Sequence, residues 1–241
     1  MDRPMRSRRE RLRAETIREI KSHALRQMAE GGPSAISLRA IARDMGMTAG
    51  AIYSYYDTRD DLISTLIGDV YTALADGYEA ALASVPADDP AGRVLAVGES
   101  FRRWAVGHPE EFRLLYGDPA PGYQAPKGAA AVEAEHRACA VITGLVDAAW
   151  PRARHHWTDD DYTWDDFDPD FAAVVRATYP DLPPTGVALA MRVWGRMHGL
   201  VSLEVYGHIA PQVRDPAKLY RAELLDLMTT LRLTAPDARS A

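Results

Sequence analysis

The chain has 241 residues, of which 47% are hydrophobic, and a net charge of −6, so it is long and apolar enough for one large or two small domains with a buried core. It contains no run of about 18 apolar residues that would predict a membrane span, and its arginine-rich start lacks the apolar segment of a secretory signal. A single cysteine, Cys139, excludes an internal disulfide and favours a reducing, cytoplasmic location.

The charge is distributed unevenly along the chain. Residues 1–26 contain nine Lys and Arg against four Asp and Glu, although the whole chain is acidic. This asymmetry predicts a basic N-terminal arm that neutralises nucleic-acid phosphates. The alternative for some of these arginines is an ordinary solvated helix start.

The first predicted helix ends at Glu30. Ile17, Ile20, Ala24 and Met28 recur on one face of it, and the run Gly31-Gly32-Pro33 terminates it.

A pair of short helices follows in residues 37–61, SLRAIARDMGMTAGAIYSYYDTRDD. Ser37 caps the first helix, and Gly46 stops it because glycine adopts the left-handed conformation that helix ends often need. Thr48 caps a second helix predicted over residues 49–55. Two short helices joined by a glycine turn are typical of the helix-turn-helix unit, whose second helix lies in the DNA major groove.

The second helix has the residues that a DNA-reading helix needs. Ala49 and Gly50 are small, so the helix N-terminus can approach phosphates and base edges closely. We expect the hydroxyl groups of Tyr53 and Tyr55 and the positive charge of Arg59 to contact phosphate oxygens of the DNA. Ile52 and Tyr56 are assigned to the core instead, since they lie on the opposite side of the helix.

The pattern S-L-R-x-I-A-x-x-M-G-M-T-x-G-A-I-Y-x-Y-Y-x-T-R-D-D-L resembles the TetR family of bacterial transcription regulators over about residues 12–66. Tyr56, Arg59 and Thr48 stand where the family usually has Phe, Lys and Ser, and each keeps the chemistry. Residues 194–204, WGRMHGLVSLE, also resemble the W-x-x-x-H-G motif of one C-terminal subtype of the family.

The rest of the chain reads as further helices, because the period-two alternation of strands is absent. The predicted fold class is therefore all-α, with an N-terminal helix-turn-helix domain at residues 1–57 and a larger helical domain at residues 58–241. Helices after Thr58 are predicted to occupy residues 58 to about 83, 90–106, 109–116, 129–150, 185–208 and 216 to about 231.

Residues 151–184 are rich in Asp and aromatic residues and are predicted to be a surface insertion. The spacing from Asp159 to Asp170 resembles a calcium loop, but Trp164 stands where the sharp turn requires glycine. We therefore predict no metal, no cofactor and no catalytic residue.

The resemblance implies a ligand-responsive repressor that is homodimeric through its last two helices and binds a near-palindromic double-stranded DNA operator. DNA contacts are predicted from Arg39, Thr48, Ala49, Gly50, Tyr53, Tyr55 and Arg59. An aromatic and methionine-lined pocket for a small, mostly apolar effector is predicted from Phe101, Trp104, Phe112, Tyr116, Met191, Trp194 and His198, with core packing as the alternative for each.

Two other classes of function stay open at this point. One is a helical enzyme that carries an N-terminal helix-turn-helix, although no phosphate loop, nucleophile elbow or metal-spaced set of residues supports it. The other is a helical protein-interaction module, against which the basic arm and the intact surface from Thr48 to Arg59 argue.

Overall fold

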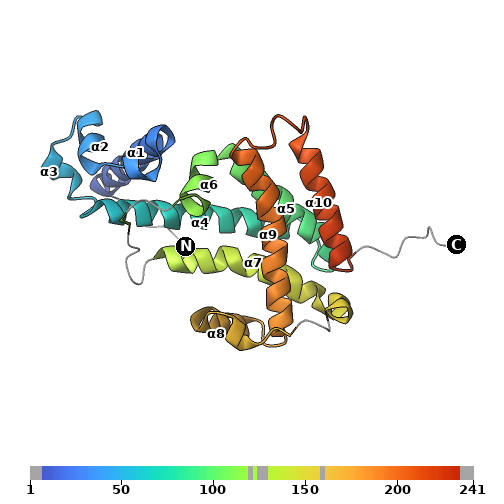
Figure 1. Cartoon of the computed structure of the whole chain (residues 1–241). Helices are drawn as coiled ribbons and strands as arrows, with labels where there is room; N and C mark the ends of the chain where they lie inside the picture. Colours follow the sequence, from blue (N-terminus) through green and yellow to red (C-terminus); the bar gives the residue numbers. More distant parts are fainter. Residues whose placement is uncertain (1–6, 119–121, 124–129, 158–160, 234–241) are drawn as a thin grey trace. The chain divides into compact units, whose positions relative to one another are not determined.

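The computed structural model describes residues 7–118, 122–123, 130–157 and 161–233, and over these residues it contains helices and no strand (Figure 1). The prediction of an all-α fold is confirmed. The α-helices are α1 (Arg8–Gly31), α2 (Leu38–Asp44), α3 (Ala49–Ile52), α4 (Arg59–Ala83), α5 (Pro90–Gly107), α6 (Pro109–Tyr116), α7 (Ala130–Ala153), α8 (Pro169–Thr178), α9 (Pro184–Val205) and α10 (Pro216–Thr230).

The chain divides into two compact units, each assembled from two stretches of sequence. The first unit comprises residues 1–71 and 108–134, and the second comprises residues 72–107 and 135–241. The first unit therefore contains the start of α4 and all of α6 besides α1, α2 and α3. The long helix α4 is continuous from one unit into the other.

The first unit is built around one apolar core. α1 begins in a capping box, in which the Ser7 backbone N–H donates to Glu10 Oε2 (2.7 Å) and the Glu10 N–H donates to Ser7 Oγ (3.2 Å), so two N–H groups of the helix start are satisfied. The core brings together one face of α1, both short helices and the first turns of α4, through Ile20, Ala24, Met28, Ile41, Ile52, Tyr56, Leu62 and Leu66.

The second unit is centred on α5, α9 and α10, which pack against one another (Figure 1). Val97 and Phe101 of α5, Met197 of α9 and Leu224 of α10 are almost fully buried. α5 and α10 approach so closely at Gly98 that a Cβ there would lie 2.5 Å from Leu224 Cδ2. Glycine at this position is therefore a packing requirement.

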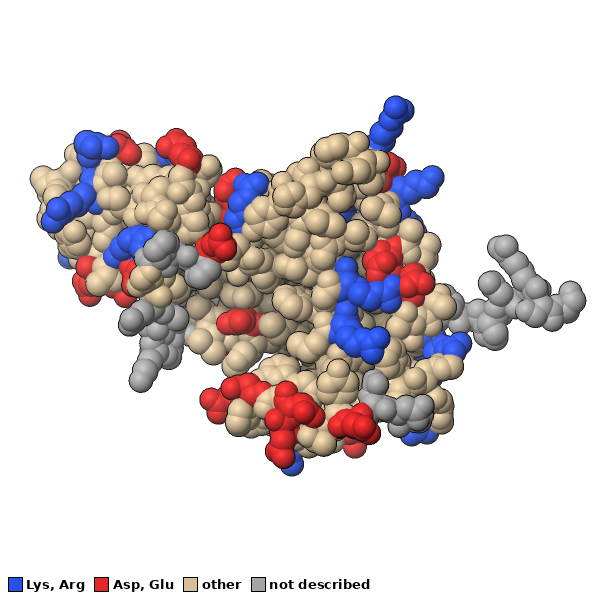
Figure 2. Space-filling model, viewed as in Figure 1, with Lys and Arg blue, Asp and Glu red and all other residues tan. Residues whose placement is uncertain are grey.

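The acidic segment contains a helix, α8, that the sequence analysis did not predict. Asp168 caps α8 by accepting from the N–H groups of Asp170 (3.0 Å) and Phe171 (3.1 Å). Trp164, Phe167 and Phe171 pack against buried Val175 and other apolar residues, while acidic side chains gather on the surface around α8 (Figure 2). Asp159 lies outside the described residues.

Two other helix ends differ from the expectation. α7 continues through Pro151 to Ala153, and α9 ends at Val205, before the expected His208. The start of α9 at Pro184 agrees with the expectation, since proline suits the first helical position. Among the described helices, none combines the length and apolar character that a membrane crossing requires.

Candidate nucleic-acid interface and effector cavity

The turn between α2 and α3 has the geometry that its glycine predicts. Gly46 has φ +66°, in the left-handed region that a residue with a Cβ rarely enters. The chain then turns back, so that the Met47 N–H donates to the Ala42 carbonyl (2.8 Å). This bond satisfies a carbonyl at the end of α2 and fixes the direction in which α3 leaves the turn.

α3 is a single α-helical turn, shorter than the predicted residues 49–55. Thr48 caps it by accepting from the Ala51 N–H (3.2 Å). After Ile52 the chain forms tighter turns than an α-helix. In these turns the N–H groups of Ser54 and Tyr55 donate to the carbonyls three residues earlier, at Ala51 and Ile52. Ile52 and Tyr56 are buried, which confirms their assignment to the core, and burial raises the pKa of Tyr56 to about 12, with a further contribution from Asp69 and an opposing one from a Thr65 hydrogen bond.

Most of the predicted DNA-contacting residues lie on the surface of the first unit. Arg39, Thr48, Ala49 and Gly50 are exposed, and Tyr53 is 41% exposed. Apart from the chain neighbours of Gly50 and the backbone of its own helix, no described heavy atom lies within 4 Å of a Cβ built on Gly50. The N-terminal end of α3 is therefore open to an approaching ligand, and Figure 2 shows basic side chains over the part of the molecule that α2 and α3 occupy.

Tyr55 is half-buried beneath an arginine of α1. The Arg13 guanidinium carbon lies 4.8 Å from the centre of the Tyr55 ring, and Arg13 Nη2 donates to the Ser54 carbonyl (3.0 Å). Arginine above an aromatic face is attracted by the ring electrons. The contact joins the basic start of α1 to the segment after α3, and the sequence analysis did not predict it.

Arg59 is directed toward the backbone of its own unit. Its Nε donates to the Ile36 carbonyl (3.0 Å) and its Nη2 to the Pro33 carbonyl (2.7 Å). These two bonds tie the first turn of α4 to the connection between α1 and α2. Arg59 therefore has a structural role that the sequence pattern did not indicate.

The helix-turn-helix region matches the family model described as bacterial regulatory proteins, tetR family, over residues 20–66, and residues 94–227 match the model of the tetracyclin repressor-like C-terminal domain. The chain belongs to the TetR family. It is a DNA-binding transcriptional regulator.

Comparisons with single proteins cover most of the chain. The chain is 33% identical over 213 residues to the HTH-type transcriptional regulator Rv1816 of Mycobacterium tuberculosis, which covers 86% of this chain and 88% of the relative. The solved structure named as regulatory protein SCO4313 is 36% identical, covers 92% of this chain and 100% of its own, and has a TM-score of 0.70. A tetR-family protein from Rhodococcus RHA1, at 15% identity and a TM-score of 0.59 over 92% of this chain and 99% of its own, shares the fold.

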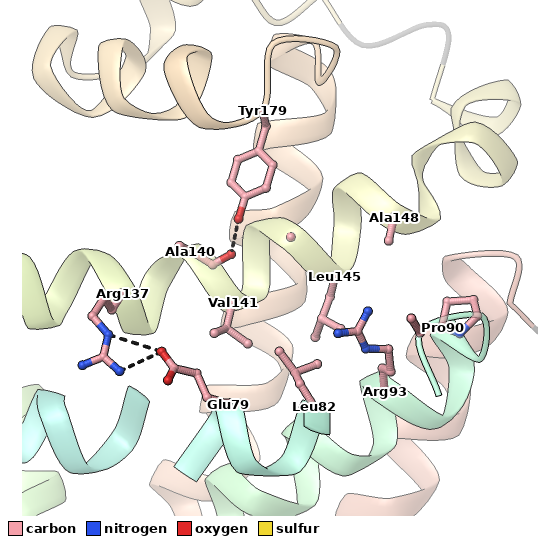
Figure 3. A pocket seen from close by; sticks show the side chains of 12 residues that line it. Glu79, Leu82, Pro90, Arg93, Arg137, Ala140, Val141, Leu145, Ala148 and Tyr179 are labelled. Carbon is pink, nitrogen blue, oxygen red and sulfur yellow. Dashed lines mark hydrogen bonds and ion pairs between the residues drawn. The ribbon is translucent and has the colours of Figure 1, made fainter. Parts of the chain in front are cut away.

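A cavity of about 420 Å³ lies within the second unit, in the range of about 300–1,000 Å³ typical of small-molecule sites. It is formed by the end of α4, the start of α5, the middle of α7 and Tyr179, the residue after α8 (Figure 3). Its apolar wall consists of Leu82, Ala87, Pro90, Ala140, Val141, Leu145 and Ala148.

Most of the polar side chains that line the cavity already form hydrogen bonds or ion pairs within the protein. Arg137 Nη2 donates to Glu79 (2.7 Å) and Asp76 (2.9 Å), and hydrogen bonding to Glu79 and then Asp76 raises the pKa of Arg137. The Tyr179 hydroxyl donates to the Ala140 carbonyl (2.8 Å), as Figure 3 shows. Burial, followed by the nearby Asp147, raises the pKa of Tyr179, so the hydroxyl remains a donor.

Arg93 is the exception among these groups. Its Nε is buried and has no hydrogen-bond partner among the described residues. A buried donor without an acceptor costs roughly 1–3 kcal/mol, and more when the group is charged. Figure 3 shows the Arg93 side chain reaching from α5 toward Leu145 of α7.

None of the seven predicted ligand-binding residues lines this cavity. Phe112 and Tyr116 belong to the first unit, where their ring centres are 5.1 Å apart. In the second unit Phe101 is 1% exposed, and its ring centre lies 6.0 Å from those of Trp104 and of His198. Met191 and Trp194 are exposed, and burial lowers the pKa of His198.

The sequence analysis missed Arg93 and the other residues of the cavity. Their spacing is that of ordinary helix residues, and an arginine one turn after an Asp-Pro helix start carries no sign of whether a carboxylate will meet it. Only the three-dimensional arrangement distinguishes Arg93 from Arg137.

Proposed function

We propose that the protein is a homodimeric, ligand-responsive repressor that binds a near-palindromic operator and is released from it by a small, mostly apolar molecule. The observation that carries the proposal is the open N-terminal end of α3. A Cβ built on Gly50 there would meet no described atom within 4 Å outside its own helix and chain neighbours, and exposed Thr48 and Tyr53 flank it. This end of a recognition helix can reach base edges without displacing protein atoms. Such a regulator acts in the cytoplasm, on DNA.

In this proposal the residues around α3 form two groups, one near the base edges and one on the DNA backbone. Arg39, Thr48, Ala49 and Gly50 approach base edges or the phosphates beside them. Tyr53 and Tyr55 hold the DNA backbone and set the register. Arg59 has little capacity left for phosphate, because two of its nitrogens already donate to backbone carbonyls.

The proposed dimer uses α9 and α10. Exposed apolar side chains support this choice, since Met191, Trp194 and Leu203 of α9 and Leu219 and Leu225 of α10 are each at least 38% exposed. A two-fold dimer presents two recognition helices to half-sites about one helical turn apart, or a multiple of that distance. The resemblance of residues 194–204 to the W-x-x-x-H-G subtype stays part of the proposal.

An effector acts by favouring one arrangement of the dimer over another. It must bind the two arrangements unequally, because a ligand with equal affinity for both shifts nothing. α4 offers a route for such coupling, since it carries core residues Leu62 and Leu66 of the first unit near its start and the cavity residues Glu79 and Leu82 near its end. The effector site predicted from the sequence is the aromatic set that includes Phe101, Trp194 and His198, and none of these residues lines the cavity.

Fluorescence anisotropy with labelled DNA from upstream of the protein's own gene tests the proposal at two salt concentrations. We expect site-preferring binding that weakens steeply with salt, since phosphate contacts release counterions, and a run-off transcription assay should show repression. Competition with unrelated DNA is the control. Equal affinity for both DNAs, or binding that salt does not affect, would overturn the repressor assignment.

A further inference from the structure

The cavity formed by α4, α5, α7 and Tyr179 combines an apolar wall with two arginines in different states. Arg137 is neutralised by Glu79 and Asp76. Arg93 has a buried Nε that lacks an acceptor among the described residues. The cavity therefore offers a hydrogen-bond donor with positive charge and, beside it, apolar surface from Leu82, Val141 and Leu145.

We propose that this cavity is the effector site and that the effector is a small organic anion, a carboxylate with an apolar body. The proposal rests on the proposed function, in which a bound small molecule controls the affinity for DNA. It departs from the aromatic set predicted from the sequence, because Arg93 and the wall residues of the cavity replace that set as the binding site.

The chemistry of Arg93 selects a carboxylate. The two terminal nitrogens of a guanidinium form a planar pair of donors that matches the two oxygens of a carboxylate, and such charge-assisted bonds are shorter and stronger than neutral ones. The Tyr179 hydroxyl is already directed to Ala140, so it leaves the headgroup to Arg93. A carboxylate there would neutralise the Arg93 guanidinium, which lines the cavity and has no ion pair among the described residues.

The same arrangement rejects other classes of apolar molecule. A neutral compound of the same shape would cover the Arg93 guanidinium without neutralising its charge, and removing an unpaired cation from water opposes binding. An apolar cation would bring a like charge to Arg93. The volume of about 420 Å³ lies in the lower part of the range for small-molecule sites, which suits a medium-chain or aromatic acid.

Calorimetric titration of the full-length protein with octanoate, decanoate and 2-naphthoate tests the inference, each compared with its primary amide. We expect at least one anion to bind the wild-type protein and its amide to bind at least about tenfold more weakly. Arg93→Gln should weaken anion binding by at least about tenfold and leave amide binding nearly unchanged, and Arg93→Lys should fall between the two.

Two matched variants separate the cavity from other sites. Arg103→Gln makes the same chemical change on an exposed residue of the same helix, outside the cavity, and should bind the anion as the wild type does. His198→Ala tests the aromatic set and should also leave anion binding unchanged. Near-UV circular dichroism of Arg93→Gln should match the wild type, since Arg93 Nε has no described partner to lose.

The outcomes distinguish this inference from the function on which it rests. Failure of the wild type to bind any of the three anions, equal binding of acid and amide, or an effect of His198→Ala in place of Arg93→Gln would each overturn it. When the anion binds at Arg93, its addition should also raise the Kd for upstream DNA. Site-preferring DNA binding without anion binding would leave the repressor and remove only this effector, whereas anion binding without any DNA binding would remove the repressor.

Discussion

Gly46 and Gly50 lie four residues apart in the DNA-reading unit and are required for different physical reasons. Gly46 has φ +66°, so its role is conformational and belongs to the folded state. Gly50 is in ordinary helical backbone with empty space beyond it, so its role concerns whatever approaches from outside.

The first prediction at this scale follows from that contrast. Gly50→Val should weaken binding to the operator by about tenfold or more, because the side chain occupies the space of the DNA, and it should leave the fold intact. Gly46→Ala should instead lower the free energy of unfolding by about 1 kcal/mol. Anisotropy and urea denaturation measure the two effects. An unfolded Gly50→Val protein, or one that binds the operator normally, would contradict the assignment.

A second prediction concerns Arg59. Arg59→Ala should lower the free energy of unfolding of the first unit by about 1–3 kcal/mol, because the carbonyls of Pro33 and Ile36 lose a charged donor. Arg43→Ala is the control, since Arg43 is exposed and its one ion pair within the described part of the chain is with the adjacent Asp44. Unchanged stability of Arg59→Ala together with lost DNA binding would restore Arg59 to the phosphate-contacting set.

At the scale of single residues, sequence reasoning succeeded where periodicity decides the answer. Ile52 and Tyr56 lie four positions apart and both are buried, as residues on one helix face should be. The hydrogen bonding of Arg59 and Arg93 could not be predicted from the sequence, since the partner of a long, flexible side chain depends on atoms that are distant in the sequence.

At the scale of elements, the helices with strong apolar stripes and clear caps were predicted almost to their ends. α10 begins at Pro216 after the Asp215 cap, and α6 spans Pro109–Tyr116, both as expected. α3 was predicted too long because its last residues form tighter turns. α8 was missed because the aromatic residues before it and within it pack as a small separate cluster, which obscures the period of the helix.

The contact between α5 and α10 gives a prediction at this scale. Gly98→Ala should lower the free energy of unfolding by about 1–3 kcal/mol, because the new methyl group would overlap Leu224, which is fully buried and cannot move aside freely. Adding Leu224→Ala should make the double variant more stable than the sum of the single effects predicts.

Gly77→Ala in α4 is the matched control for Gly98→Ala. Its Cβ would meet only Ser100 Oγ at 3.7 Å, so helix propensity should stabilise the protein by about 0.5–1 kcal/mol. Urea denaturation followed by circular dichroism measures the wild type and the four variants, including Leu224→Ala alone. Similar stabilities for the two alanine variants would show that α5 and α10 can separate without cost.

At the scale of the whole molecule, the proposed dimer is the property that joins DNA recognition to regulation. Leu225→Glu should weaken self-association by about tenfold or more, because it places a charge on an apolar side chain that is 45% exposed on α10. Val174→Glu, on a 43% exposed residue of α8, should leave association unchanged. Sedimentation equilibrium distinguishes the two. Equal effects of both substitutions would remove α10 from the proposed interface.

The composition of the first unit bears on how regulators of this kind can be recombined. Its core includes Leu62 and Leu66 of α4, and α1 also contacts α6, which follows it by more than seventy residues. A chimera joined at residue 57 would strip these apolar surfaces from the DNA-reading part. A graft that contains the residues up to Tyr71 together with α6 should still bind its own operator. A different ligand-binding unit could then be attached without changing the DNA-binding unit.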